Sequence, residues 1–226
     1  MQDRRAFVLL SGGLDSTTCL AVALQSYDRK QITAISFDYQ QRHSIEITQA
    51  KYIATAMGVG HKVMALEEMP KTMLTDKDAA VPDISYGDIT GVSPMYVPFR
   101  NGLMLSKVAS FAAGTVPNKV PIEIFIGTHA EDAANDAYPD CRLDFIGAMG
   151  AAMYIGSYHQ IRIRAPLIEM LKSDIVRLGF RLNVPFEHTW SCYKGGAVHC
   201  GTCATCRSRK KAFETARVED PTEYAA

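Results

Sequence analysis

Short apolar runs alternate with segments of helical periodicity along this chain. The runs are rich in β-branched residues and predict strands over residues 6–10, 32–37, 62–66, 122–126 and 161–165. Because strands that alternate with helices form βαβ units, the sequence predicts an α/β fold with a parallel sheet and right-handed crossovers. Ligands of such sheets bind beyond the carboxyl ends of the strands.

Three helices are predicted between these strands. Two of them carry an apolar face at helical spacing, one formed by Ala50, Ile53, Ala54 and Met57 and the other by Ile175, Leu178, Gly179 and Leu182. Ser44 and Ser173 are their candidate N-caps. The segment 102–113 is apolar nearly all round, which predicts a buried helix.

Two segments depart from this alternation. Residues 67–98 contain four prolines and show no clean periodicity, which is typical of a lid, a partner contact or a partly disordered segment. The cysteine-rich end of the chain is the other. We therefore expect a main domain over residues 1–187 and a small module with a helix over residues 188–226.

Composition narrows the class of protein. The 226 residues, 47% of them hydrophobic, suffice for one α/β domain with a small appendage. Lysine plus arginine equals aspartate plus glutamate at 24 each, so charge gives no support to a nucleic-acid partner. No apolar run approaches the roughly 20 residues that span a bilayer, and no signal-peptide pattern precedes the first strand. We therefore expect a cytoplasmic protein without a membrane partner.

The first predicted strand ends in a glycine-rich loop, FVLLSGGLDS, that runs into a helix. Glycines let backbone N–H groups approach an anion, and a helix N-terminus adds unpaired N–H groups and the positive end of its dipole. The predicted phosphate-binding residues are Leu10, Ser11, Gly12, Gly13, Leu14, Asp15, Ser16 and Thr17. Asp15 suits an anion site as a ligand of Mg²⁺ that bridges phosphates, or it caps the helix. A capped turn without a ligand is the alternative.

Further polar and aromatic residues follow strands at the same predicted edge of the sheet. They are Phe37 and Asp38, Arg42 and His43, Arg100 and Asn101, and Lys172. Phe37 and Asp38 end the second predicted strand, and Lys172 stands at a helix start within reach of a phosphate. Each alone is more often a surface charge or a helix cap. Together they favour a nucleotide site.

Four of the six cysteines crowd into the C-terminal segment as Cys192-x7-Cys200-x2-Cys203-x2-Cys206. In a cytosolic chain this spacing indicates a metal site before disulfides. Four thiolates in one short module favour a closed, structural, tetrahedral Zn²⁺ site. An iron–sulfur cluster is the rival, because Cys-x2-Cys-x2-Cys also occurs in ferredoxin-type runs.

The glycine loop has neither the Gly-Lys-Ser/Thr of a Walker loop nor the Gly-x-Gly-x-x-Gly of a dinucleotide site. It resembles the PP-loop of N-type ATP pyrophosphatases, which implies a Rossmann-like PP-loop ATPase domain. That resemblance also implies cleavage of ATP between the α- and β-phosphates. The loop would hold the departing pyrophosphate while an oxygen nucleophile is adenylated.

Taken with the other motifs, the chain resembles a narrower family, 7-cyano-7-deazaguanine synthase. The motifs are SGGLDSTTC at 11–19, FDYQQRH at 37–43, RN at 100–101, YPDCR at 138–142 and the four cysteines. The resemblance implies that 7-carboxy-7-deazaguanine and ammonia are converted to the nitrile through an adenylate and an amide. It further implies ATP, Mg²⁺ and Zn²⁺ as cofactors and a homodimer.

The resemblance also implies roles for residues at the phosphate site. Asp15, Ser16, Lys172 and Arg100 would carry catalysis with Mg²⁺ and the loop N–H groups, by positioning the reactants and neutralising charge. No nucleophilic side chain is needed, because ATP supplies the activation.

Substrate recognition falls on a second group of residues. A carboxylate can accept both N–H donors of the deazaguanine edge, and Asp140 is the first candidate, with Glu131 and Asp132 next. Tyr138 would stack on the purine face. The remaining candidates are Arg42, His43 and Asn101. An ordinary turn is the alternative interpretation of Tyr-Pro-Asp.

The chain departs from the family pattern beside the expected substrate pocket. Phe99 stands where the family usually has glycine before Arg-Asn, and residues 131–137 read EDAANDA where a Thr-Asp and a glycine are usual. These departures leave three products open: the nitrile, the amide, or a conjugate of the deazaguanine with a macromolecule.

A tRNA thiolase of the same superfamily is a rival from another class of reaction. It needs a sulfur-carrying cysteine or an iron–sulfur cluster and a basic surface for RNA. Cys19 lies inside the first predicted helix, where a small buried side chain is expected. Cys141 stays a candidate for the sulfur-carrying cysteine. A zinc-stabilised module that binds ATP without catalysis is a second rival, and the intact Ser-Gly-Gly-x-Asp-Ser loop counts against it.

Overall fold

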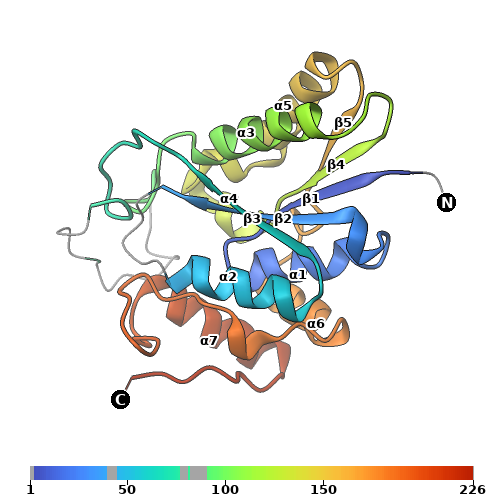
Figure 1. Cartoon of the computed structure of the whole chain (residues 1–226). Coiled ribbons are helices and arrows are strands. Elements are labelled where there is room, and N and C mark those ends of the chain that lie inside the picture. Colours follow the sequence, from blue (N-terminus) through green and yellow to red (C-terminus); the bar gives the residue numbers. More distant parts are fainter. Residues whose placement is uncertain (1–2, 40–44, 77–80, 82–90, 226) are drawn as a thin grey trace.

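A single parallel sheet forms the centre of the molecule. The computed structural model describes residues 3–39, 45–76, 81 and 91–225. Its strands are β1 (Arg5–Leu9), β2 (Ile32–Asp38), β3 (Gly60–Ala65), β4 (Ile122–Phe125) and β5 (Ile161–Arg164). They lie in the order β3-β2-β1-β4-β5, and every neighbouring pair is parallel (Figure 1). The predicted fold class and all predicted strands are therefore confirmed.

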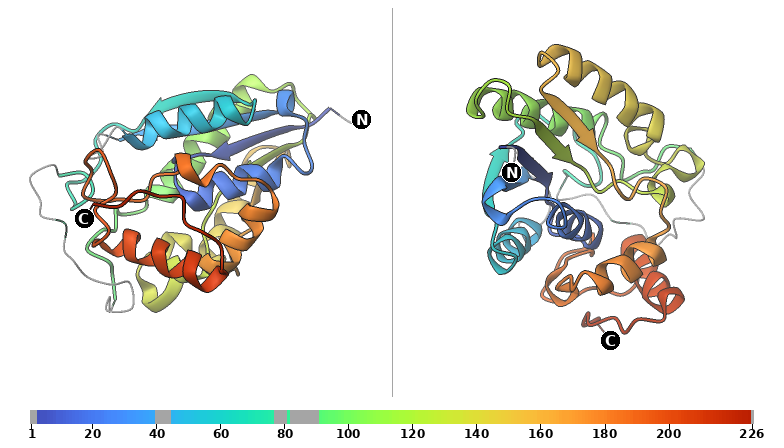
Figure 2. Two further views of the ribbon diagram at one scale, coloured as in Figure 1. Left: turned by 90° about the horizontal axis from the view of Figure 1, so that it is seen from below. Right: turned by 90° about the vertical axis from the view of Figure 1, so that its right-hand side faces the viewer.

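Helices cover both faces of the sheet. On one face lie α1 (Leu14–Ala23), α2 (Ile45–Ala56), α6 (Lys172–Arg181) and α7 (Ala204–Ala216), and on the other lie α3 (Arg100–Thr115) and α5 (Leu143–Gly156) (Figures 1 and 2). The short helix α4 (Ala130–Ala133) follows β4. No helix among the described residues is long and apolar enough to cross a membrane.

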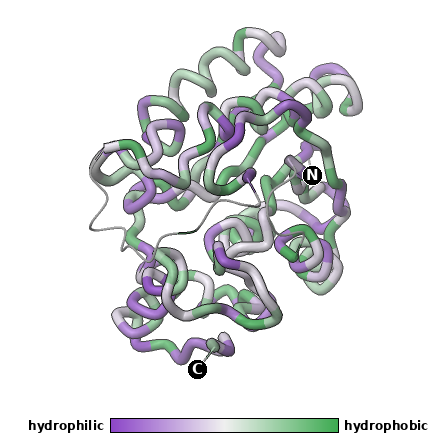
Figure 3. The backbone as a smooth tube through the Cα atoms, turned by 90° about the vertical axis from the view of Figure 1, so that its left-hand side faces the viewer, coloured by the Kyte–Doolittle hydropathy of each residue, from purple (hydrophilic) through white to green (hydrophobic). Residues whose placement is uncertain are grey.

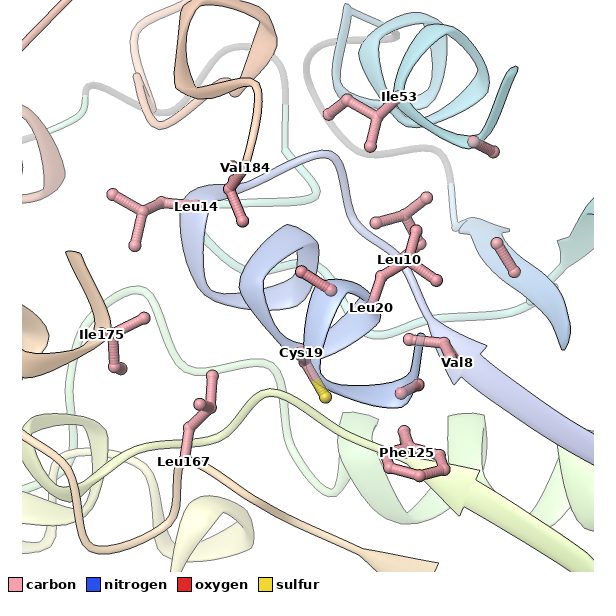
Figure 4. Packing of buried hydrophobic residues seen from close by; sticks show 14 of the residues in the cluster. Val8, Leu10, Leu14, Cys19, Leu20, Ile53, Phe125, Leu167, Ile175 and Val184 are labelled. Atoms are coloured by element: carbon pink, nitrogen blue, oxygen red, sulfur yellow. The ribbon is translucent and has the colours of Figure 1, made fainter. Parts of the chain in front are cut away.

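The sheet buries an apolar cluster on each face. On the face of α1, the side chains of Val8, Leu10, Leu20 and Ile53 are all but inaccessible to solvent and pack together (Figure 4). Burial of one such side chain contributes about 1.5–3 kcal/mol. The second cluster joins β1, β2 and β4 to α3 and α5. Hydrophobic and hydrophilic residues alternate along the helices, as expected where one helix face is buried (Figure 3).

The strand order places a crevice between the carboxyl ends of β1 and β4. Successive strands run outward from β1 to β3, and the chain then crosses back to β4 on the other side of β1. Ligands of such sheets bind at this switch point. Gly127 follows β4, and a Cβ there would lie 3.1 Å from the carbonyl carbon and oxygen of Asp15. The absence of a side chain at Gly127 thus lets the end of β4 approach the start of α1.

The structure corrects the predicted burial of the helix over 102–113. α3 buries Leu105, Val108 and Ala112 along one face and leaves Leu103 exposed. It lies in the outer layer of the molecule, where the sheet covers only one of its sides.

The predicted N-cap Ser173 is also wrong. Ser173 lies buried within the first turn of α6, and Leu171 holds the cap position with extended backbone. A carboxylate oxygen of Glu131 accepts a hydrogen bond from the Lys172 N–H at 2.9 Å. A residue distant in the sequence thus pairs an N–H group at the start of α6 that a local N-cap would otherwise pair. The other predicted cap, Ser44, lies outside the described residues.

The described residues between β3 and α3 contain no helix or strand, in line with the prolines of segment 67–98. At the other end of the chain, α7 packs against α6 and contributes Ala212, Phe213 and Ala216 to the same core cluster as α1. A boundary at residue 188 therefore stays a prediction, with the last helix sharing the core of the main domain.

The side chain of Arg209 holds α7 against this core through hydrogen bonds. Its guanidinium is fully buried and donates hydrogen bonds to Thr189 Oγ1 at 2.6 Å, to the Phe186 carbonyl at 3.1 Å and to Asp220 at 3.1 Å. Every one of these acceptors is thereby paired with a charge that cannot reach water.

Replacing Arg209 is expected to loosen α7. Arg209→Met leaves two buried acceptors and the partly buried Asp220 with fewer donors, and the free energy of unfolding should fall by about 3 kcal/mol. Urea unfolding measures this, with the exposed Lys211→Met on the same helix as control. Equal stability of the two variants would contradict the role given to Arg209.

Candidate active site

A cavity of about 270 Å³ opens at the carboxyl ends of β1, β2 and β4. It is lined by residues from the glycine loop, α1, α2, α3, α4, α6 and the segment before the cysteines. The charged side chains in its wall are Asp15, Glu46, Arg100, Asp132 and Lys172. The structure thus brings together Asp15, Arg100 and Lys172, which the sequence had placed at one edge of the sheet.

Gly12 makes the tight turn of the loop possible. Its φ angle is 83°, a left-handed conformation that favours glycine, and a Cβ there would lie 2.4 Å from the Glu46 carbonyl oxygen. The Gly12 carbonyl in turn accepts a hydrogen bond from the Trp190 N–H at 2.8 Å. The loop is therefore held from two sides, by α2 and by the segment that leads to the cysteines.

The loop leaves the first N–H groups of α1 facing the cavity. Gly13 is the N-cap of α1 and no side chain caps this end. Ser11 and Ser16 line the cavity with their hydroxyl oxygens 3.0 Å apart, whereas the Thr17 hydroxyl donates to the Gly13 carbonyl at 2.7 Å and is buried outside the wall. Unpaired N–H groups at a helix start form an anion site.

Asp15 lies at the centre of the charges. One carboxylate oxygen, Oδ2, is 3.1 Å from Lys172 Nζ and 3.7 Å from His129 Nε2. Burial alone would raise the pKa of Asp15, but Lys172 and His129 lower it below the ordinary value. The second oxygen, Oδ1, is buried and has no hydrogen-bond partner among the described residues. An orphaned carboxylate oxygen beside an anion site fits a divalent cation that bridges phosphates.

Asp15 does not cap α1, which separates the two roles predicted for it. Lys172, the first residue of α6, is its ion-pair partner. Burial would lower the pKa of Lys172, yet Asp15 and Asp132 raise it above the ordinary value. Lys172 is therefore a cation at every physiological pH.

His129 and Asp132 extend this group of charges and lie at the start of α4. His129 is buried, and its Nε2 is 3.4 Å from Asp132 Oδ1. The sequence had named Asp132 but missed His129. The available signal was its position just after β4, at the carboxyl edge of the sheet.

Arg100 and Glu46 belong to another part of the wall. Arg100, at the start of α3, donates a hydrogen bond to the Tyr39 hydroxyl at 3.1 Å. Glu46, in the first turn of α2, was missed by the sequence reasoning because an acid in a first turn is usually a solvated dipole partner. Burial raises the pKa of Glu46 to about 7, against the opposing effect of Arg100.

The Tyr-Pro-Asp motif lies behind the wall. Asp140 is buried and accepts a hydrogen bond from the Asn101 N–H at 2.9 Å, which holds the start of α3. The Tyr138 hydroxyl accepts one from Ser93 Oγ at 3.0 Å. Neither side chain lines the cavity, and Glu131 is bound to the Lys172 N–H instead. Of the three carboxylates predicted to meet the substrate, Asp132 alone lies in the wall, while Asn101 lines it as well.

Of the remaining predicted residues, some line the cavity and some do not. Phe37 lines the cavity, and Asp38 is exposed and lies outside the wall. Arg42 and His43 lie outside the described residues. Phe99 is the N-cap of α3 and has a φ angle of 56°, a left-handed conformation that favours glycine.

The four predicted metal ligands come together. The sulfur atoms of Cys192, Cys200, Cys203 and Cys206 all lie within 4.8 Å of one another. The Cys203 N–H donates to Cys200 Sγ at 3.3 Å, the kind of bond that stabilises a thiolate ligand. Tetrahedral binding of one metal ion by four sulfurs fits this cluster.

Trp190 connects the cysteine cluster to the phosphate loop. Its backbone N–H donates to Gly12, and its indole N–H donates to the Cys192 carbonyl at 3.0 Å. One face of the indole packs against His199, with ring centroids 4.2 Å apart. The geometry of the cysteines is thereby linked to the geometry of the loop.

Comparison with known proteins gives consistent relatives. A family model described as "Queuosine biosynthesis protein QueC" matches residues 5–217. A protein named 7-cyano-7-deazaguanine synthase from Thermoplasma acidophilum is 43% identical over 99% of this chain and 93% of its own length. Proteins of the same name from Oceanobacillus iheyensis and Caldicellulosiruptor bescii are 42% and 41% identical, over 99% and 97% of this chain and 100% and 97% of their own lengths.

Solved structures resemble the chain more distantly. An NMN synthetase from Francisella tularensis matches 96% of this chain and 79% of its own, with a TM-score of 0.49 and 14% sequence identity. A likeness at this level says nothing about the substrate.

Gly12→Ala is expected to disrupt the loop. The substitution forces a left-handed alanine against a backbone carbonyl, and the free energy of unfolding should fall by about 2 kcal/mol or more. Gly13→Ala is the matched control, because φ there is −83° and its Cβ would lie 3.3 Å from the flexible Ser11 hydroxyl. Urea unfolding without nucleotide compares the two. Equal losses would show that the turn at Gly12 does not need glycine.

Proposed function

The chain belongs to the family of the queuosine biosynthesis protein QueC, and we propose that it is an ATP-dependent 7-cyano-7-deazaguanine synthase. In this reaction the carboxylate of 7-carboxy-7-deazaguanine is adenylated, ammonia forms the amide, and a second activation by ATP dehydrates the amide to the nitrile. The observation that carries the proposal is the orphaned Oδ1 of Asp15 beside the unpaired start of α1.

Different groups of the cavity would bind different parts of ATP. The N–H groups at the start of α1 would bind the pyrophosphate, with Ser11 and Ser16 adding hydroxyl donors. Lys172 would neutralise charge that develops on the departing pyrophosphate. Mg²⁺, held by Asp15 Oδ1, would screen the phosphates. Arg100 lies in the wall near Tyr39, where it can orient a carboxylate or the α-phosphate.

Substrate recognition is proposed for the residues that reach the cavity. Phe37 offers an aromatic surface for adenine, and Asp132 and Asn101 are polar groups in the wall for the deazaguanine. Asp140 and Tyr138 would position α3 and its Arg100 rather than touch the base. Arg42 and His43 stay predicted substrate residues.

The two isolated cysteines argue against a thiolase. Burial raises the pKa of the Cys19 thiol, which lies in the core cluster of α1. Burial, together with Asp132 and Asp140, also raises the pKa of the Cys141 thiol. A thiol that stays protonated is a poor nucleophile and a poor sulfur carrier. A relative that stops at the amide, or that conjugates the deazaguanine, is the second candidate, favoured by the changed segment 131–137.

We further propose that the four cysteines hold Zn²⁺ in a structural role. All four come from one short segment, and their sulfur atoms supply the complete tetrahedral ligand set that is typical of a structural site. The resemblance of the sequence to the synthase family also supports a homodimer in the cytoplasm.

A product assay tests the proposed function. Incubation with 7-carboxy-7-deazaguanine, MgATP and ammonium should yield AMP, pyrophosphate, the amide as intermediate and the nitrile, as identified by mass spectrometry. Accumulation of the amide alone would favour the second candidate, and absence of AMP would refute both. Asp15→Asn should lower AMP release at least about 10³-fold, because the cation and Lys172 lose their partner. Asp144→Asn, an exposed acid outside the cavity, is the control.

Removal of the metal should unfold the cysteine segment. One zinc per chain is expected, and chelation should lower Tm by about 10 °C, because metal binding supplies folding free energy to this segment. Cys203→Ser should lose the metal while Cys19→Ala retains it. Elemental analysis and thermal denaturation provide the measurements. Iron in place of zinc, with a charge-transfer absorption band, would overturn the assignment.

A further inference from the structure

Glu46 occupies a fixed place in the wall of the cavity. It lies in the first turn of α2, partly buried, and its side chain lines the same cavity as the phosphate loop. Its backbone carbonyl is packed so closely on Gly12 that a Cβ there would come within 2.4 Å. This packing holds the first turn of α2, and with it Glu46, against the loop that binds phosphate.

The other two carboxylates of the wall each lie next to a nitrogen-bearing side chain. Asp15 is paired with Lys172, and Asp132 lies 3.4 Å from His129. Among the described residues, no hydrogen bond or ion pair engages the carboxylate of Glu46. Within the part of the chain that the structure describes, Glu46 is therefore the acid of the cavity wall without a hydrogen-bond or ion-pair partner.

Charged and titratable groups face this cavity from every element around it. They are Asp15 of α1, Tyr39 after β2, Arg100 of α3, Asp132 of α4, Cys141, Lys172 of α6, Cys192 and Tyr193. Burial is the larger effect on Glu46 and raises its pKa to about 7, while Arg100 opposes it. A group that titrates near the working pH can both accept and release a proton.

The proposed reaction requires such a group. Ammonium, like the ammonium of lysine, is protonated at neutral pH, and a protonated nitrogen has no lone pair for attack. The site must therefore attract a small cation and remove its proton next to an adenylated carboxylate. The partly buried carboxylate of Glu46, which has no hydrogen-bond or ion-pair partner among the described residues, meets both needs.

We propose that Glu46 binds the ammonium substrate and accepts a proton from it before attack on the adenylated carboxylate. One proton moves from ammonium to the carboxylate, and the lone pair of the resulting ammonia forms the C–N bond. The bond between the carbonyl carbon and the phosphate oxygen breaks, and its electron pair leaves with AMP. AMP takes the second proton from the nitrogen, and Glu46 returns its proton to solvent.

The test separates adenylation from amide formation, since the inference rests on the proposed function. Exchange of pyrophosphate into ATP that depends on 7-carboxy-7-deazaguanine reports adenylation alone. Amide formation is followed with ammonium, and hydroxamate formation with hydroxylamine, a nucleophile that is largely unprotonated at neutral pH. Glu46→Gln should keep the exchange within about threefold of wild type and lower amide formation about 10²-fold or more. Hydroxylamine should restore near wild-type rates.

The pH profile adds a readout that a structural role would not move. In the wild type, kcat/KM for ammonium should rise as pH rises through about 7, because Glu46 acts in its deprotonated form. This rise should be lost in Glu46→Gln and regained in part in Glu46→Asp. The exposed acid Glu169 lies outside the cavity, and Glu169→Gln serves as the matched control.

Each other outcome overturns the inference. Equal loss of exchange and amide formation in Glu46→Gln would mean that Glu46 acts on ATP or on the deazaguanine. Equal loss with ammonium and hydroxylamine would mean that it does not deprotonate the nucleophile. Absence of exchange in the wild type would instead refute the proposed function itself.

Discussion

The partly buried ion pair between Asp15 and Lys172 is the interaction on which the site depends. Lys172 opens α6, so its positive charge lies at the unfavourable, positive end of that helix dipole, and the Asp15 carboxylate compensates for this. Asp15 provides the carboxylate from the first turn of α1. The pair therefore joins the starts of two helices and brings a fixed positive charge to the place where phosphate charge must be neutralised. Gly127 completes the arrangement, because a side chain there would press against Asp15.

The cysteine cluster acts on the same loop from the outside. Trp190 bonds both to Gly12 and to Cys192, while Arg209 holds the helix that carries Cys206 against the core. A metal ion bound by the four sulfurs would thus stabilise more than a peripheral segment. It would also fix the backbone segment around Trp190, which lies against one side of the phosphate loop. This connection gives a physical reason for a structural metal in a protein whose own core is already substantial.

Much of this architecture follows from local patterns in the sequence. Apolar runs predict all the strands, and the glycine loop and the helix starts at Arg100 and Lys172 lie at the carboxyl edge of the sheet, as its parallel order predicts. The spacing of the four cysteines predicts their cluster. Long-range contacts set the limits of this reasoning. Glu131 replaces Ser173 as the cap of α6, and the Asn101 N–H donates to Asp140, which lies outside the cavity wall. Glu46 and His129 went unnoticed because their environment is created by segments remote in the sequence.

Phe99 links the start of α3 to α5. The residue has a left-handed conformation at the N-cap of α3, and its ring packs on Phe145 with centroids 5.4 Å apart. A Cβ on Gly102 would come within 2.3 Å of that ring. A larger residue at position 102 would therefore require the Phe99 ring to move. The side chains that fit at positions 99 and 102 thus depend on each other.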